Sequence, residues 1–201
     1  MIAIHKNGTV LSHKVFLFPG GEVGVKLDVD NLRYLHDPGI QTVTARLQSS
    51  MDVIELIMVT DALRRWDKAP IRLVLPYVPY GRQDRVCVSG EAFSLKAFAA
   101  IINTLGFVSV TTFDPHSDVT PAVLDKVEVI NQLTILGKFN EFNAYIVNAS
   151  PVFVSPDAGA NKKTSELASH YGHSTFLRAD KLRDLSTGKI KEIVVVNSRE
   201  E

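Results

Sequence analysis

The chain has 201 residues, enough for one well-packed domain or two smaller ones, and its 22 basic residues are balanced by 22 acidic ones. This balance argues against a nucleic-acid-binding protein. No apolar run approaches the ~18 residues of a membrane span, and the N-terminus lacks the charged-then-apolar order of a signal peptide. A single cysteine, Cys87, excludes an internal disulfide framework. The composition therefore predicts a soluble, cytoplasmic protein that binds neither nucleic acid nor membranes.

The first part of the chain carries signals for a hairpin and a strand. Apolar, β-branched runs over residues 9–18 and 22–28 flank Pro19-Gly20-Gly21, which predicts a β-hairpin. Residues 41–47 alternate polar and apolar side chains, as a half-buried strand does.

A helix is predicted over residues 53–66. Ser49 and Ser50 precede it, and Asp52 supplies an acid at the spacing of a capping box. The two serines have two interpretations, a plain helix cap or a phosphate site at the helix N-terminus.

The remaining elements alternate between strands and helices, which predicts an α/β fold with doubly wound, mostly parallel sheets. The expected strands cover residues 71–75, 107–113, 127–130 and 152–154, the helices 94–105 and 161–170, and a closing hairpin 181–196. The asparagine-rich stretch 138–150 is interpreted as a polar connection between domains. It predicts a domain boundary there, with a first domain over 1–137 and a second over 138–201.

The strand at 71–75 leads into the strongest functional signal. Pro76 and Pro79 end the strand, since neither has a backbone N–H for the sheet, and Gly81 is interpreted as freeing the backbone. A polar cluster follows at once: Arg82, Gln83, Asp84 and Arg85. Ligands of open α/β sheets bind at the carboxyl ends of strands, and two guanidinium groups suit a phosphate-bearing ligand. A solvated surface loop is the alternative.

Polar groups also follow two other predicted strands. Asp114 and His116 come after the strand at 107–113, and Asp157 comes after the strand at 152–154. Right-handed parallel connections bring such ends to one sheet edge, where arginines would bind phosphate while Asp157 and His116 hold Mg²⁺, directly or through water. The alternatives are an ordinary turn at His116 and a helix cap at Asp157.

The string Pro76-Tyr77-x-x-Tyr80-x-Arg82-Gln83-Asp84-Arg85 resembles the nucleotide-binding segment of ribose-phosphate pyrophosphokinases (phosphoribosyl pyrophosphate synthetases). Other segments resemble the same family: Phe113-Asp114-Pro115-His116-Ser117, Ser155-Pro156-Asp157-Ala158-Gly159, Phe18-x-x-Gly21-Glu22 and Asp180-Lys181-Leu182-Arg183.

The resemblance implies a type I phosphoribosyltransferase-like fold, with an N-terminal domain and an incomplete second domain. It also implies transfer of the β,γ-pyrophosphoryl group of Mg²⁺–ATP to the anomeric hydroxyl of ribose 5-phosphate. By this resemblance, the ATP-binding residues are Phe18, Glu22, Arg82, Gln83, Asp84 and Arg85. His116 and Asp157 belong to the metal site, and His116, Lys181 and Arg183 to the catalytic set. Since Phe18 and Glu22 reach a neighbouring subunit's adenine, a homo-oligomer is implied. Without the resemblance, Lys181 and Arg183 are ordinary exposed charges.

The chain departs from the family pattern in three places. Residues 86–91 carry fewer cations, and Gly20 stands where the family has an acid. The family's acceptor-phosphate loop, Asp-Asp-x-x-Asp-Thr-x-Gly-Thr, has no counterpart, so the resemblance covers about two-thirds of the family's length. Two alternatives therefore stay open beside the enzyme: a non-catalytic nucleotide-binding or regulatory subunit, and an enzyme for another ribosyl acceptor such as ADP-ribose.

Overall fold

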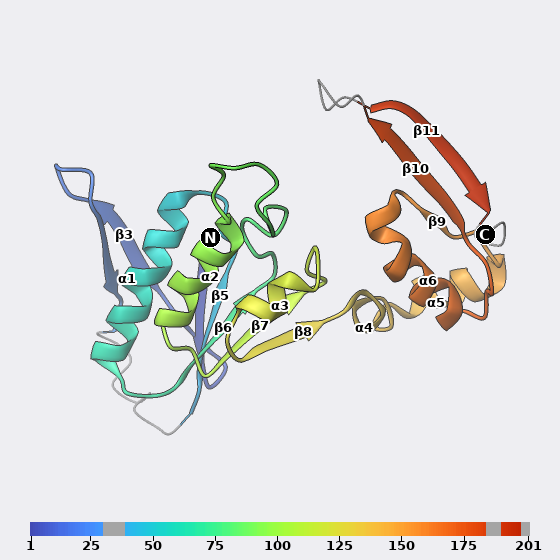
Figure 1. Ribbon diagram of the computed structural model, residues 1–201. Coiled ribbons are helices and arrows are strands. Elements are labelled where there is room, and N and C mark those ends of the chain that lie inside the picture. The colour runs from blue at the N-terminus through green and yellow to red at the C-terminus, as the bar shows by residue number, and fades with distance from the viewer. Residues whose placement is uncertain (30–38, 184–189, 198–201) are drawn as a thin grey trace. The chain divides into compact units, whose positions relative to one another are not determined.

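The computed structural model describes residues 1–29, 39–183 and 190–197 (Figure 1). It divides the chain into two compact units, Met1–Asn131 and Gln132–Glu201. The division falls after Asn131, whereas the sequence predicted it after residue 137.

The first unit is built on a six-stranded sheet in the order β2-β1-β5-β6-β7-β8. Its strands are β1 (Ile2–Lys6), β2 (Thr9–Leu11), β5 (Gln41–Ala45), β6 (Ile71–Leu75), β7 (Ser109–Phe113) and β8 (Val127–Ile130). The four strands from β5 to β8 are parallel, and β1 runs antiparallel to both β2 and β5. The parallel part therefore matches the prediction, while β1 is a strand that the sequence analysis missed.

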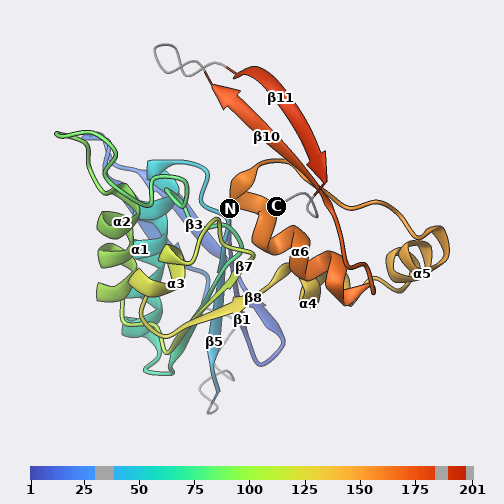
Figure 2. The same ribbon diagram turned by 45° about the vertical axis from the view of Figure 1, so that its right-hand side comes forward.

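Three helices connect the parallel strands: α1 (Ser50–Trp66), α2 (Ser94–Thr104) and α3 (Val119–Val123). Each connection leads to the next strand in the same direction, so right-handed crossovers place all three on one face of the sheet, as Figure 2 shows. Side chains at alternate strand positions fill the core beneath them, and Ile4, Val43 and Leu73 are fully buried. The carboxyl ends of β6 and β7 are adjacent, since Leu75 pairs with Thr112.

The start of α1 is a capping box, as predicted. Ser49 Oγ accepts a hydrogen bond from the Asp52 N–H at 3.2 Å, and Asp52 Oδ2 accepts from the N–H groups of Gln48 and Ser49 at 2.7 and 2.8 Å. These hydrogen bonds satisfy backbone N–H groups at the start of the helix with side chains of the same segment. The hydrogen bond from the Gln48 N–H, above all, lowers the pKa of Asp52.

Asp52→Asn is expected to lower the free energy of unfolding by about 1 kcal/mol at pH 7. A carboxyl whose pKa is lowered on folding contributes stability above its unfolded pKa of ~3.9, and this is lost as the pH falls through the folded value. Urea unfolding at pH 7 and pH 3 should show the difference from wild type shrinking in acid. The control is Asp61→Asn, which breaks an exposed pair with Arg65 and should leave the free energy of unfolding at pH 7 nearly unchanged. A pH-independent difference for Asp52→Asn would contradict the assignment.

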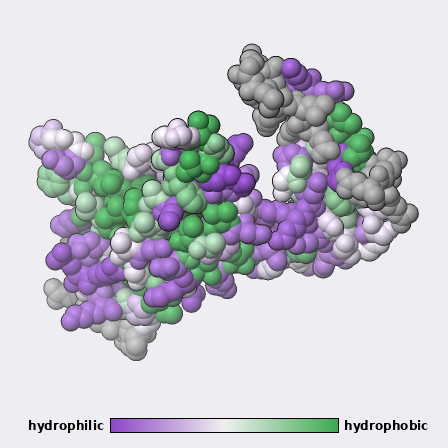
Figure 3. Space-filling model, viewed as in Figure 1, coloured by the Kyte–Doolittle hydropathy of each residue, from purple (hydrophilic) through white to green (hydrophobic). Residues whose placement is uncertain are grey.

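A separate hairpin, β3 (His13–Leu17) with β4 (Val23–Leu27), confirms the predicted turn at Pro19-Gly20-Gly21. It packs on α1 through β4, and His13 Nε2 lies 2.9 Å from Glu55 Oε1 of that helix. Hydrophobic surface covers part of the hairpin (Figure 3). Leu17 and Phe18, at the end of β3, are more than half exposed.

The second unit contains α4 (Gln132–Leu136), α5 (Asn140–Ala149), β9 (Val154–Ser155), the short 3₁₀ helix η1 (Ala158–Ala160), α6 (Asn161–His170), β10 (Leu177–Arg183) and β11 (Ile190–Asn197). Helix α6 matches its predicted range. The antiparallel pair β10–β11 confirms the closing hairpin, whose predicted turn at 187–188 lies outside the described residues.

The prediction of a polar connection over 138–150 is wrong, because α5 occupies most of it. Ile146 is buried against the same small core as Phe153 and Ala168, so the helix has an apolar anchor. Asn143 supports it by donating from Nδ2 to the carbonyl oxygens of Leu136, Gly137 and Phe139 at 3.2, 3.3 and 3.1 Å. The Asn143 amide therefore supports the start of α5, while most other residues of the helix are exposed.

Candidate functional site

The loop after β6 is folded by consecutive turns. The Gly81 N–H donates to the Val78 carbonyl at 3.2 Å, the Gln83 N–H to the Tyr80 carbonyl at 2.8 Å, and the Leu95 N–H of α2 to the Gln83 carbonyl at 3.3 Å. The left-handed backbone of this loop is at Tyr80, with φ 63°, and not at Gly81. Gly81 is needed for close approach instead, because a Cβ there would lie 3.2 Å from the Val78 oxygen and 3.7 Å from His116 Cβ.

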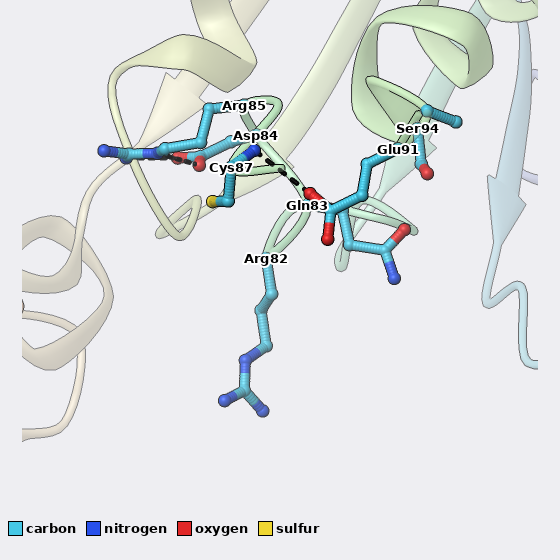
Figure 4. A pocket seen from close by; sticks show the side chains of 8 residues that line it. Arg82, Gln83, Asp84, Arg85, Cys87, Glu91 and Ser94 are labelled. Atoms are coloured by element: carbon cyan, nitrogen blue, oxygen red, sulfur yellow. Dashed lines mark hydrogen bonds and ion pairs between the residues drawn. The ribbon is translucent and has the colours of Figure 1, made fainter. Parts of the chain in front are cut away.

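This loop and the start of α2 enclose a pocket of about 360 Å³. Its lining residues are Arg82, Gln83, Asp84, Arg85, Cys87, Glu91, Ala92 and Ser94 (Figure 4). The predicted polar cluster thus lines one cavity at the carboxyl end of β6, together with residues that the sequence analysis did not select.

Asp84 is the most constrained group of the pocket, since it is only 6% exposed. Its carboxylate accepts from Arg85 Nε and Nη2 at 2.8 and 3.1 Å, and from Ser117 Oγ at 2.6 Å. These hydrogen bonds, led by the one from Arg85, lower the pKa of Asp84 to about 2, and the charge of His116 adds to the effect. Asp84 is therefore a carboxylate at neutral pH and connects the loops that follow β6 and β7.

Glu91, the other acid of the pocket, also binds within the chain. Its Oε2 atom accepts from the backbone N–H groups of Cys87 and Val88 at 3.0 and 3.1 Å. This closes the turn that precedes α2, where Gly90 has the left-handed φ of 93°.

The cationic and amide groups of the pocket remain for a ligand. The structure records no side-chain hydrogen bond or ion pair between Arg82, Gln83 or Ser94 and any described residue. In Figure 4 the Arg82 side chain extends away from the Asp84–Arg85 pair. Because both carboxylates already bind internal donors, the groups offered to a ligand favour an anion that accepts hydrogen bonds.

The structure brings His116 near this loop, since a Cβ added at Gly81 would lie 3.7 Å from His116 Cβ and the charge of His116 helps to lower the pKa of Asp84. Phe18 and Glu22 lie at the tip of the β3–β4 hairpin, where the Phe18 ring packs edge-on against Phe16 at 5.1 Å between centroids. The Glu22 carboxylate lies over Gly20, whose Cβ would be only 2.5 Å from it. Among the described residues, no hydrogen bond connects the hairpin tip to the pocket.

The other predicted residues belong to the second unit. Asp157 Oδ1 accepts from the Ala160 N–H at 3.1 Å and caps η1. Asp157 is therefore a helix cap, as one of the two interpretations predicted, and its part in a metal site stays a prediction. Lys181 and Arg183 lie in β10, and their side chains are outside the described part of the structure.

Sequence reasoning did not select Ser117 or Glu91 as site residues. Ser117 directly follows His116, but nothing in its spacing indicates a bond to Asp84. Within the described residues there is no group of three or more His, Cys, Asp or Glu side chains that could hold a metal ion. No helix in the same residues is both long and apolar enough to cross a membrane.

The fold and the pocket define an α/β protein with a polar, arginine-bearing loop at the carboxyl edge of a parallel sheet. Residues 1–106 match the model of the N-terminal domain of ribose phosphate pyrophosphokinase. The chain belongs to the ribose-phosphate pyrophosphokinase family.

Individual relatives agree with this assignment. The ribose-phosphate pyrophosphokinase of Listeria ivanovii is 30% identical over 152 residues, which is 75% of this chain and 46% of the relative. That of Aquifex aeolicus is 31% identical over 156 residues, 77% of this chain and 49% of the relative. The chain spans about half the length of these curated relatives.

A crystal structure of phosphoribosylpyrophosphate synthetase from Mycobacterium smegmatis has the same fold. The TM-score is 0.71 at 23% identity, and the match covers 94% of this chain and 59% of that one. The predicted fold class, α/β with a mostly parallel sheet of the type I phosphoribosyltransferase-like kind, is confirmed.

Proposed function

We propose that the chain binds Mg²⁺–ATP in the pocket between β6 and α2. The observation that carries this proposal is the distribution of charge in the pocket. Asp84 and Glu91 are bound to internal donors, whereas Arg82, Gln83 and Ser94 have no described side-chain partner. Guanidinium and amide donors that line one pocket at the end of a parallel strand suit the phosphates of a nucleotide.

We further propose that the bound nucleotide is a pyrophosphoryl donor to ribose 5-phosphate. In this reaction the anomeric hydroxyl oxygen bonds to the β-phosphorus of ATP, and the bond from that phosphorus to the α,β-bridging oxygen breaks. AMP leaves with the bridging oxygen, the hydroxyl proton passes to water, and phosphoribosyl pyrophosphate forms. Such transfers depend on positioning and on cations near the developing charge.

The family resemblance supports Lys181 and Arg183 as cations that stabilise the transferred group, and it also counts His116 among the catalytic residues. Phe18 and Glu22 would contact the adenine of a neighbouring subunit, which makes a homo-oligomer part of the proposal. A cytoplasmic location is proposed on the same resemblance.

Magnesium would enter with the nucleotide and offset phosphate charge. Mg²⁺ keeps several waters and takes only one or two protein carboxylates besides phosphate oxygens. The family resemblance supports Asp157, and His116 through water, as protein contacts of this ion.

Asp157→Asn tests the metal assignment. Asparagine can keep the cap on η1 but removes the charge, so the Mg²⁺ concentration for half-maximal turnover should rise about 10-fold while thermal unfolding changes little. The matched control, Asp61→Asn on the exposed face of α1, should leave the Mg²⁺ dependence unchanged. An unaltered magnesium titration in Asp157→Asn would leave the residue with only its capping role.

The function is tested by measuring AMP formation from Mg²⁺–ATP, with ribose 5-phosphate and then ADP-ribose as acceptor. AMP release that depends on ribose 5-phosphate is the expected result. Release that depends only on ADP-ribose would replace the acceptor, and ATP binding without turnover would favour a non-catalytic nucleotide-binding subunit.

A further inference from the structure

We propose that Asp84 and Ser117 form a positioning pair, the Asp84–Ser117 clamp, which holds the loop after β6 on the loop after β7. In this arrangement Asp84 serves the ligand through Arg85 and the loop backbone instead of contacting the ligand. The ligand part of this inference rests on the proposed nucleotide function, whereas the joining of the loops does not.

The acceptor sites of Asp84 are largely occupied. A carboxylate has about four lone-pair sites, and three hydrogen bonds reach this one: one at Oδ1 from Arg85 Nε and two at Oδ2 from Arg85 Nη2 and Ser117 Oγ. The residue is also buried, with only 6% of its surface exposed. A direct ligand contact would have to displace one of these bonds, whereas Arg82 and Gln83 beside it need no such exchange.

Ser117 is itself held in place. Its Oγ lies 3.4 Å from the Val119 N–H, and its carbonyl accepts from the Thr120 N–H at 3.3 Å, so it opens the first turn of α3. The base of the same loop is fixed to β8, because the Asp114 N–H donates to the Ile130 carbonyl at 2.9 Å. Asp114 adopts a left-handed backbone with φ 40°, a conformation that persists only where surrounding contacts enforce it.

The partner loop has its own attachments. Leu95 of α2 donates to the Gln83 carbonyl at 3.3 Å, and the Tyr80 ring packs against Phe98 at 5.8 Å between centroids. Asp84 therefore connects two segments that are each anchored to a helix. Arg85, whose side chain is 69% exposed, keeps one orientation through its two bonds to Asp84, so its ordering need not occur on binding.

The test compares Asp84→Asn, Ser117→Ala and their combination in the full chain. Backbone amide exchange over residues 80–91, measured without nucleotide, should be about 10-fold faster in both single variants. The affinity for Mg²⁺–ATP should fall about 10-fold in Asp84→Asn and about 3- to 10-fold in Ser117→Ala. The double variant should bind Mg²⁺–ATP no more weakly than the single variant with the lower affinity, because both changes break the same interaction.

Two controls separate the clamp from a general loss of structure. Ser117→Thr keeps the hydroxyl and should restore wild-type amide exchange and wild-type nucleotide affinity. Asp61→Asn removes an exposed aspartate–arginine pair of the same chemistry, with 2.7 Å between Arg65 Nε and Asp61 Oδ2. This second control should change neither the exchange rates nor the affinity.

The outcomes distinguish this inference from the nucleotide proposal. Wild-type exchange and wild-type affinity in Ser117→Ala, with weakened binding in Asp84→Asn alone, would overturn the clamp and make Asp84 a direct ligand. If amide exchange in the loop is faster in both single variants but the wild-type chain binds no Mg²⁺–ATP, the clamp between the loops is supported and the proposed function is overturned.

Discussion

Replacing Arg82 with alanine is expected to weaken Mg²⁺–ATP binding by about 1–3 kcal/mol, the range for a charge-assisted hydrogen bond to phosphate. Arg82 lines the pocket, has no described side-chain partner, and extends away from the pair that Asp84 forms with Arg85 (Figure 4). Its removal should therefore cost ligand contacts without opening an internal ion pair. Calorimetric titration measures the effect.

The control for this variant is Arg72→Ala. Arg72 is also an exposed arginine of the first unit, but it lies within β6, and its Nε donates to Ser109 Oγ at 3.1 Å. Its loss should leave the dissociation constant unchanged. An equally unchanged constant for Arg82→Ala would return the loop to the solvated-surface interpretation.

Asp67→Asn should destabilise the chain by about 3–5 kcal/mol, the range for removing one partner of a buried ion pair. Lys6, at the end of β1, is 1% exposed, and its Nζ forms an ion pair with Asp67 just beyond α1. The same ammonium lies 5.7 Å from the centroid of the Trp66 ring. The amide can still accept from the Ala69 N–H, which lies 3.1 Å from Asp67 Oδ1, so the loss reports on the charge. Urea unfolding at pH 7 measures it.

The double variant Lys6→Met with Asp67→Asn separates charge from packing. Apolar side chains of similar volume often replace a buried ion pair at little cost, so the second change should recover most of the lost stability. If the two changes simply add, the pair is not the source of the effect.

Much of the fold follows from local pattern. The apolar run at Ile71–Leu75 and the capping residues Ser49 and Asp52 are sufficient to predict β6 and the start of α1, since a short buried strand and a capped helix are encoded by adjacent residues. Helix α5 could not be predicted in this way. Its asparagines are loop-forming by local preference, and the burial of Ile146 against Phe153 and Ala168, which lie later in the chain, opposes that preference.

The same distinction between local and long-range information applies to the candidate site. Arg82, Gln83, Asp84 and Arg85 are consecutive, so their common position at a strand end can be read from the sequence. The bond between Asp84 and Ser117 joins residues 33 positions apart, and the pair of Lys6 with Asp67 joins residues 61 apart. Both depend on which strands are neighbours, which no local pattern specifies.

The measurement that bears most directly on the nucleotide pocket is calorimetric titration of ATP into the wild-type chain in the presence of Mg²⁺. Saturable binding of one nucleotide per chain, weakened in Arg82→Ala and retained in Arg72→Ala, is the predicted result. No detectable binding by the wild-type chain, or binding that Arg82→Ala leaves unchanged, would contradict a nucleotide site between β6 and α2.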